Sequence, residues 1–531
     1  MRAFVLLLLI AACGGTHGQS VCENQIPPPA ACMQACDPTP GAPNTCPGGF
    51  HCTPDGRCDA QCTPGGSECG EGYTCTSDGA CVSGTGCTGI QCQIVDCVKM
   101  GLPPTTISGK VFAPNGTLPL YDVTVYVPNE PVPAFPSGAQ CSRCSDDLPG
   151  KPVVQSLTRE DGSFSVSDVP AGDNIPVVVT IGKWRRQIVV PHIEQCTDNP
   201  IAAADLSLPK SMTDMSPLTT SVDIPKIAIS TGSADSLECL IRKLGIADSE
   251  IGTGGGAQRI HLYSDNGAKA GNDIGTGTTR FAGGASFTDS TQLWDSVNHL
   301  NPYDIVILSC EGGQYPVTKP QSALDALKAY ADLGGRVFLS HWHNIWVAGS
   351  AVYDSHFPQK PAVWSDLVTG WHSGLNGQDE LPAGTIDLID ESSNPKGASF
   401  ATWIQNTTGN PRDDIPLVDQ NGKSTGRSTA GTLDLTRAER WTSIKGLPST
   451  TQNFQFTTPL EMPEGGRCGK VAFSDMHVSQ GPIHAFNPRS GKNDGPILDY
   501  PMNCNPGDLT AQEKALAFML FDISSCVGSL L

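Results

Sequence analysis

The sequence predicts a multidomain protein with a disulfide-rich N-terminal segment, a β-sandwich, and an α/β domain that has a doubly wound parallel sheet and a long insertion. Three observations lead to this fold class. Of the 22 cysteines, 13 lie between Cys22 and Cys97. From Thr106, apolar and polar residues alternate as in half-buried strands. From residue 226, apolar runs such as 305–308 and 337–339 indicate strands that are buried on both faces. A single core is too small for 531 residues.

The net charge restricts the classes of partner. It is −20 at pH 7, so the phosphates of nucleic acids and anionic lipid surfaces would be repelled. We therefore expect no nucleic acid partner. After the start of the chain, no stretch approaches the roughly 18 apolar residues that a membrane span needs.

The first residues form a short export leader. Arg2 precedes an apolar run, which ends in Ile10-Ala-Ala-Cys13. This sequence resembles the cleavage box of bacterial lipoproteins. The resemblance implies removal of residues 1–12, lipidation of Cys13, and a tether (13–21) that holds the mature protein at an outer membrane or cell surface. The alternative is an ordinary secretory peptide, and both alternatives predict an exported protein.

Residues 22–98 lack apolar periodicity and contain a cysteine repeat. The segment from Cys46 to Cys58 matches that from Cys69 to Cys81, with five residues between successive cysteines, an aromatic residue at the same place and an Asp-Gly turn. It resembles the small knotted repeats of extracellular proteins. A zinc site would need closer cysteine pairs, so we expect disulfides that make a spacer. The sequence leaves their connectivity open.

The sequence predicts that the sandwich covers residues 106–208 and that a linker covers residues 209–221. The motifs Asp161-Gly-Ser-Phe164 and Val169-Pro-Ala-Gly172 resemble those of the carboxypeptidase regulatory-like domain, a prealbumin-like fold. The resemblance implies a structural or carbohydrate-binding role without catalytic residues. Trp184 is expected in the core.

Cys141-Ser-Arg-Cys144 and Cys196 form a second cysteine group. A redox pair or half of a zinc site would fit the Cys-x2-Cys spacing, but no neighbouring motif supports either. We favour a disulfide from Cys141 or Cys144 to Cys196.

Residues 222–527 alternate predicted strands and helices. Ser322 can cap the helix that stops at Gly334, and Thr510 forms a capping box with Glu513 in the last helix. Right-handed crossovers between parallel strands imply a flavodoxin-like sheet. The predicted strands cover 226–230, 260–263, 305–308, 336–339 and 470–474, with helices over 237–244, 293–300, 322–331 and 510–523.

Three of these segments resemble the class I glutamine amidotransferase-like fold, in its trehalose-utilisation-type branch: 303–309, 333–340 and 470–477. The resemblance implies a nucleophile turn after the strand at 336–339 and a catalytic histidine at His477. The turn reads Ser340-His-Trp-His343 and contains no cysteine. Glutamine hydrolysis needs a thiolate there, so the sequence favours a noncatalytic domain.

Cys310 lies one strand earlier, where the family places a glycine-rich oxyanion loop. Together with Glu311, Gly312 and Gly313 it predicts a ligand-facing loop at the carboxyl end of a strand. Lipidation of Cys13 leaves 21 cysteines, an odd number, which makes Cys310 a candidate free thiol. We favour a buried, inert Cys310 over a nucleophile.

Two pairs of polar residues suggest a metal site. His341 and His343 are two residues apart, so they point the same way if the strand continues. Asp475 and His477 have the same spacing. If their strands are close, these four side chains could bind a divalent transition metal such as zinc or iron. The favoured alternative is that hydrogen-bonded histidines shape a noncatalytic pocket.

The insertion at 344–469 departs from the strand–helix alternation and holds five of the eight tryptophans. Such aromatic residues could stack on sugars, but we favour their packing in a cap.

The sequence as a whole predicts a cell-envelope lipoprotein with a binding or scaffolding role. A glycan or an envelope protein is the candidate partner. The alternatives are a metal-assisted hydrolase at the rim of the sheet and a hydrolase that uses Cys310.

Overall fold

The structure is a computed structural model, and the described residues form two compact units, Met1–Cys92 and Gln93–Leu531. The leader and Cys13 lie outside the described residues. In the described part, no helix is long and apolar enough to cross a membrane. The residues that the structure describes are 20, 22, 30–39, 45–47, 50–60, 62, 73–75, 79, 81–83, 89–264, 277–350, 359–372, 380–419, 422–478, 489, 498–505 and 507–528.

The first unit confirms the disulfide framework and the repeat. Strand β1 (His51–Cys52) pairs with β2 (Cys58–Asp59), and β3 (Tyr73–Cys75) pairs with β4 (Cys81–Ser83). Each hairpin places the second and third cysteines of its repeat opposite each other. Cys52, Cys58 and Cys75 bond cysteines outside these strands, so each hairpin is linked to the chain that precedes it. The disulfides among the described residues of this unit are Cys22–Cys32, Cys36–Cys52, Cys46–Cys58 and Cys62–Cys75.

The second unit begins with two sheets. One has the strand order β12-β10-β9-β6-β7 and the other β11-β5-β8. Strand β8 alternates as predicted, because Phe164 and Val166 are buried and their neighbours are not. Trp184 is buried, which confirms its core position. The strands are β5 (Thr106–Lys110), β6 (Thr124–Pro128), β7 (Pro152–Leu157), β8 (Ser163–Ser167), β9 (Gly172–Ile181), β10 (Trp184–Ile193), β11 (Asp198–Pro200) and β12 (Thr219–Asp223), with α2 (Ala203–Leu206) after β11.

Strand β12 includes residues that the sequence assigned to a linker. It pairs antiparallel with β10 and so belongs to the larger sheet. The sandwich therefore extends past Leu208 to Asp223. The linker prediction rested on polar residues, but a strand at the edge of a sheet can be polar on its outer face.

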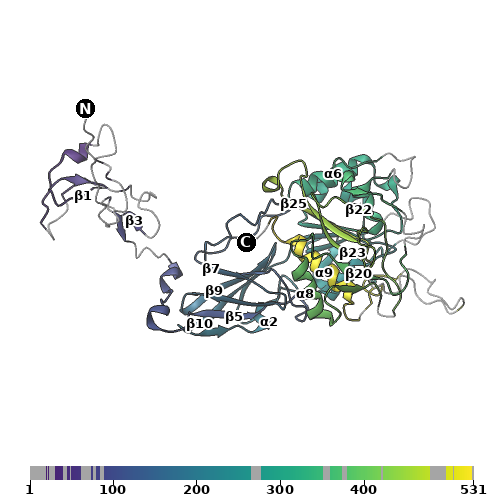
Figure 1. Cartoon of the computed structure of the whole chain (residues 1–531), viewed down its shortest axis with the longest axis horizontal. Helices are drawn as coiled ribbons and strands as arrows, with labels where there is room; N and C mark the ends of the chain where they lie inside the picture. The colour runs from purple at the N-terminus through teal and green to yellow at the C-terminus, as the bar shows by residue number, and fades with distance from the viewer. Residues whose placement is uncertain are drawn as a thin grey trace, which may run out of the picture. The chain divides into compact units, whose positions relative to one another are not determined.

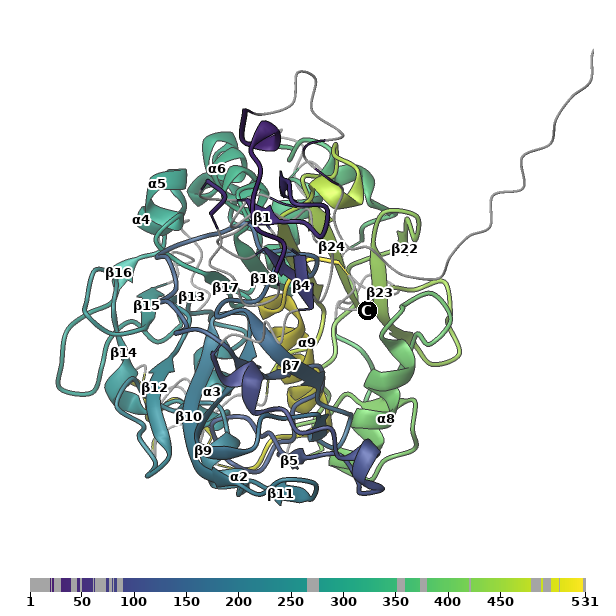
Figure 2. The ribbon, with the colours of Figure 1, turned by 90° about the vertical axis from the view of Figure 1, so that its left-hand side faces the viewer.

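The longest sheet is mixed and has the order β14-β15-β13-β17-β18-β25-β24-β23-β20-β21, with β16 beside β15. Figure 2 shows β14, β15, β13, β17 and β18 following one another from the left. Strands β14 to β25 of this order are parallel. They are β13 (Ile227–Ser230), β14 (Ile251–Thr253), β15 (Ile260–Ser264), β17 (Ile305–Leu308), β18 (Arg336–Ser340) and β25 (Gly469–Ser474), with β16 (Thr288–Asp289) at the edge.

The insertion extends this sheet with antiparallel strands beyond β25. It contains β20 (Ile386–Ile389), β21 (Asp414–Pro416), β23 (Glu439–Ile444) and β24 (Asn453–Thr458). It also contains α7 (Ile345–Ala348), α8 (Gly397–Thr408) and the two-stranded pair β19 (Val368–Thr369) and β22 (Thr432–Leu433). The insertion is thus partly continuous with the sheet, as Figure 1 shows for β20, β23 and β25.

Helices cover both faces of the parallel strands. On one face, Ile307 and Phe338 line a small cavity together with side chains of α3 (Leu237–Lys243) and α9 (Ala511–Ser524). On the other face, Val306 and Leu339 belong to a core that includes residues of α4 (Thr291–Trp294), α5 (Val297–Leu300) and α6 (Gln321–Asp332). This three-layer arrangement explains why the strands are continuously apolar.

The two predicted helix starts had different outcomes. The capping box of Thr510 and Glu513 is present at the start of α9. The cap at Ser322 is wrong, because α6 begins at Gln321 and Pro320 is its N-cap residue. Proline fixes φ near the helical value, so it can start the helix without a capping side chain.

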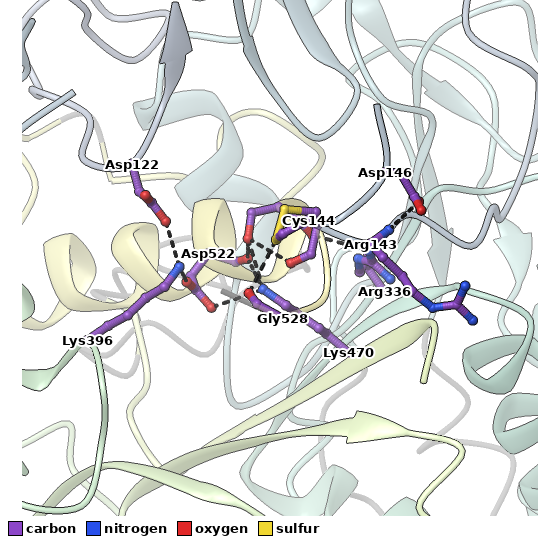
Figure 3. The surroundings of a disulfide bond; sticks show 11 residues. Asp122, Arg143, Cys144, Asp146, Arg336, Lys396, Lys470, Asp522 and Gly528 are labelled. Atoms are coloured by element: carbon purple, nitrogen blue, oxygen red, sulfur yellow. Dashed lines mark hydrogen bonds and ion pairs between the residues drawn. A yellow bond between two sulfur atoms is a disulfide. The ribbon is translucent and has the colours of Figure 1, made fainter. Parts of the chain in front are cut away.

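Two disulfides tie a loop of the sandwich to the α/β part, and they correct the predicted pairing. Cys141 bonds Cys468 and Cys144 bonds Cys526, whereas Cys196 bonds Cys97. The loop leaves the sandwich after β6, and Cys144 donates its backbone N–H to Val527. Cys196 instead follows β10. Figure 3 shows Cys144 near the ion pairs of Lys396 with Asp122 and Asp522.

Candidate functional site

The candidate site lies where three adjacent parallel strands end. Cys310 comes two residues after β17, His341 directly follows β18, and His477 comes three residues after β25. Because β18 lies between β17 and β25, these side chains meet at one edge. The Cys310 Sγ lies 3.3 Å from His341 Nδ1, and the ring centroids of His341 and His477 are 5.1 Å apart.

All three side chains are buried. Their exposed fractions are 0% for Cys310, 1% for His341 and 3% for His477. One ligand atom from each lies within 4.8 Å of the others. Burial raises the pKa of the Cys310 thiol well above its ordinary value, against hydrogen bonds from the backbone of Trp342 and Gly312. Burial also lowers the pKa of both histidines well below its ordinary value. At neutral pH the cluster is therefore a thiol and two neutral imidazoles.

The turn after β18 separates the two histidines that were expected to point the same way. The strand ends at Ser340, and His341–Asn344 form the 3-10 turn η7. His341 has φ of +42°, a left-handed conformation that is uncommon outside glycine. Successive residues of a 3-10 turn are rotated by about 120°. His343 therefore points away from His341.

His343 belongs to a second buried cluster. Its Nδ1 accepts a hydrogen bond from Trp346 Nε1 at 2.8 Å, and its Nε2 lies 3.8 Å from Glu311 Oε1. Glu311 forms a fully buried ion pair with Lys319 at 2.6 Å. Burial raises the pKa of Glu311, and the charge of Lys319 opposes this. Glu311 and His343 thus lie together but do not join the cluster of Cys310.

The glycines of the predicted loop have different surroundings. The Gly312 N–H points to the sulfur of Cys310, at 3.4 Å. A side chain at Gly313 would contact the ring of Tyr315. The amide of Gly312 is therefore directed at the cysteine of its own loop.

Asp475 is held by the insertion. Its carboxylate accepts hydrogen bonds from the Thr429 N–H at 2.7 Å, the Thr429 hydroxyl at 2.9 Å and the Ala430 N–H at 3.4 Å. These bonds fix the loop before β22 against the end of β25. Of the four residues in the predicted metal site, the structure brings His341 and His477 together and adds Cys310.

The sequence reasoning missed Asp235. Its Oδ2 accepts a hydrogen bond from the Ser340 hydroxyl at 2.6 Å, and its Oδ1 accepts from the Val478 N–H at 2.9 Å. Burial raises the pKa of Asp235 to about 7. The carboxylate links the turns after β13, β18 and β25. An acidic residue shortly after the apolar strand at 227–230 was the signal that could have found it.

A second group of possible ligands lies in the first unit. Cys36, Cys46 and Cys58 are close enough to share an ion, but all three are in disulfides. A disulfide sulfur lacks the thiolate that binds metals. Among the described cysteines, Cys310 is the free one, as expected, and it is buried.

The tryptophans of the insertion pack against other side chains, which was the favoured alternative to stacking on sugars. Trp346, Trp364, Trp403 and Trp441 are each at most 1% exposed. Trp371 is half-buried and lies edge-on to Phe473, with ring centroids 5.5 Å apart. The rings of the four buried tryptophans are thus covered by protein.

Comparisons with known proteins do not identify a family. No family model and no curated protein matches the chain. Among solved structures, partial similarity extends to two interface mutants of a type II cohesin–X–dockerin complex from Acetivibrio cellulolyticus. The C-terminal interface mutant is 17% identical, with a TM-score of 0.12, over 20% of this chain and 56% of that chain. The N-terminal interface mutant is 14% identical, with a TM-score of 0.14, over 29% of this chain and 78% of that chain.

Proposed function

We propose that this protein is an exported lipoprotein whose α/β domain binds a ligand and lacks thiol catalysis. The observation that carries the proposal is the turn after β18, where an amidotransferase-like enzyme would need its cysteine. His341 stands there, and the neighbouring thiol, Cys310, follows β17 and is buried. Because burial raises the pKa of that thiol well above its ordinary value, almost none of it is ionised at neutral pH.

The strand order supports an amidotransferase-like, flavodoxin-like origin for this domain. In chain order, β13, β15, β17, β18 and β25 are arranged 2-1-3-4-5 in the sheet. This is the order of flavodoxin-like folds, whose ligands bind beyond the carboxyl ends of the strands. The ligand site of our proposal is that same edge.

The disulfides support export. Bonded cysteines occur in both compact units, and such bonds persist in oxidising compartments. We extend this to a lipid anchor on Cys13 and to a place on the outer membrane or cell surface. The cysteine-rich segment would then be the spacer, and an envelope protein or a glycan would be within reach of the folded part.

The alternative of a metal-assisted hydrolase needs a metal with an open position for substrate. The three side chains that meet at the edge are at most 3% exposed, which favours binding over hydrolysis. A glycan platform on the tryptophans of the insertion is also disfavoured, because four of the five are buried.

Two measurements on the purified full chain test the noncatalytic role. We expect no hydrolysis of glutamine or of model amides and esters above the level of a Cys310→Ala variant. We also expect iodoacetamide at neutral pH to leave Cys310 unmodified until denaturant is added. Turnover that disappears in the variant, or rapid labelling of the native protein, would refute the proposal.

The anchor has its own test. Expression with the leader in a bacterial host that is fed a labelled fatty acid should label the wild type and leave Cys13→Ala unlabelled. Equal labelling of both proteins, or of neither, would reject the lipoprotein assignment.

A further inference from the structure

We propose that Cys310, His341 and His477 together bind one transition-metal ion of the zinc and copper class. The inference rests on the proposed function, because it names the ligand of the same edge. It differs from the site predicted from the sequence, since a sulfur replaces Asp475 and His343.

The distances suit a single ion. Zinc lies about 2.3 Å from a cysteine sulfur and about 2.0–2.1 Å from a histidine nitrogen, so tetrahedral donors are about 3.5 Å apart. Cys310 Sγ and His341 Nδ1 are 3.3 Å apart, and all three donor atoms lie within 4.8 Å of one another. Small side-chain rotations are enough to close the site.

A buried nitrogen at the site points to a ligand. His477 Nε2 is buried and has no hydrogen-bond partner among the described residues. Buried polar atoms in proteins nearly always have a partner. The rest of His477 is fixed, because its carbonyl accepts from Gln512 Nε2 and its N–H donates to Thr425. A metal ion at the centre of the cluster would give this nitrogen its partner.

The donor set selects the class of ion. One sulfur and two imidazoles suit zinc with three protein ligands or copper in a trigonal site, whereas magnesium and calcium prefer oxygen donors. Binding breaks the S–H bond of Cys310, forms a sulfur–metal bond and releases one proton to solvent. The charge of Arg427 acts on all three groups, and the thiolate is the anion that offsets it.

The surroundings hold the donors in place. The Gly312 N–H points to the Cys310 sulfur, and Asp235 ties Ser340, which precedes His341, to Val478, which follows His477. Such second contacts orient ligands in metal sites and are typically worth 10–100-fold in affinity. The site is thus built from four adjacent strand ends.

The test uses the full chain with its disulfides intact, stripped by a chelator and titrated with Co²⁺ and then Zn²⁺. We expect one ion per chain, a thiolate-to-cobalt charge-transfer band and release of one proton per ion. Cys310→Ser should remove the band, and both Cys310→Ser and His477→Gln should weaken Zn²⁺ binding at least about 100-fold. His192→Gln, at an exposed histidine, should leave binding unchanged.

The cobalt spectrum of the wild type decides the question even if a variant fails to fold. A wild type without the charge-transfer band, or Zn²⁺ affinity that survives in folded Cys310→Ser, would overturn the metal site. If the wild type binds no metal and also shows no hydrolysis, the proposed metal site is refuted and the proposed noncatalytic role is retained. If metal-free protein hydrolyses glutamine, the proposed function falls instead.

Discussion

Replacing Asp522 by asparagine should destabilise the protein, because Asp522 forms ion pairs with the buried Lys470 and the half-buried Lys396. Its carboxylate, on α9, lies 2.8 Å from Lys396 Nζ and 3.6 Å from Lys470 Nζ. Lys396 also contacts Asp122 of the sandwich at 2.7 Å (Figure 3). Burial acts to raise the pKa of Asp522, and the charges of Lys396 and Lys470 overcome it and hold the pKa well below its usual range.

The magnitude follows from the partners that would be left. Removing one member of a buried ion pair costs about 3–5 kcal/mol, and Asp122 remains beside Lys396, so we expect a loss of about 3 kcal/mol at pH 7. Burial lowers the pKa of Lys470 to about 8. Without Asp522, Lys470 can lose its proton at pH 7, one unit below that pKa. The loss of the Lys470–Asp522 interaction therefore contributes at most about 1.4 kcal/mol to the lost stability. At pH 9 Lys470 is mostly neutral in both proteins. The difference in free energy of unfolding between the wild type and Asp522→Asn should therefore be about 1 kcal/mol smaller at pH 9 than at pH 7.

The sign of each pH effect can be checked. Lys470 has a folded pKa below its unfolded value, so the stability of the wild type rises as the pH passes from about 8 to about 10.5. Asp522 has a depressed folded pKa, so its contribution is present above the unfolded pKa of about 4 and is lost as the pH falls through the folded value.

Urea unfolding with intact disulfides, followed by tryptophan fluorescence at pH 7 and pH 9, measures this loss. The control is Asp248→Asn, which removes an exposed pair with Arg242 and should cost less than about 1 kcal/mol. A loss for Asp522→Asn no greater than that of the control, or a difference that widens at pH 9, would refute the reasoning.

Three further changes test the packing around the fold and the site by the same unfolding assay. Thr510→Ala removes the capping box of α9 and should cost about 1 kcal/mol; no loss would contradict the cap. Trp403→Ala empties a site that is 1% exposed and should cost about 3–5 kcal/mol, whereas a loss below 1 kcal/mol would mean that the ring is not enclosed. Gly232→Ala would push a methyl group against the Cys310 carbonyl, so it should lower both stability and Zn²⁺ affinity, while Gly465→Ala meets no atom within 4 Å and should change neither. Unaltered stability and affinity in Gly232→Ala would contradict the packing of this loop.

Local signals predicted the parallel strands and the last helix. Continuous apolar runs such as 227–230 and 305–308 can be buried only between two layers of helices, and the structure has them there. The capping box needs two residues three positions apart, so it too is visible in the sequence. The fold class was confirmed to this extent, while the insertion added antiparallel strands to the same sheet, which its departure from the strand–helix alternation did not predict.

Features that depend on distant residues could not be predicted. Cys141 and Cys468 are separated by 327 residues, and nothing in the spacing of cysteines specifies such a pair. The directions of His341 and His343 depended on where β18 ends, which a single residue with positive φ decides. Asp235 was overlooked because its role comes from contacts with residues more than 100 positions away.

The left-handed backbone of His341 connects the fold to the proposed site. Strained positions of this kind cost about 1–3 kcal/mol and persist where the surrounding structure requires them. Extended backbone beyond Ser340 would turn successive side chains to opposite faces and carry the imidazole of His341 away from its present direction. The observed turn instead directs this ring toward Cys310 and His477. A turn that holds a nucleophile in one kind of protein can therefore hold a metal ligand in another, since both uses need one side chain at the rim of the sheet.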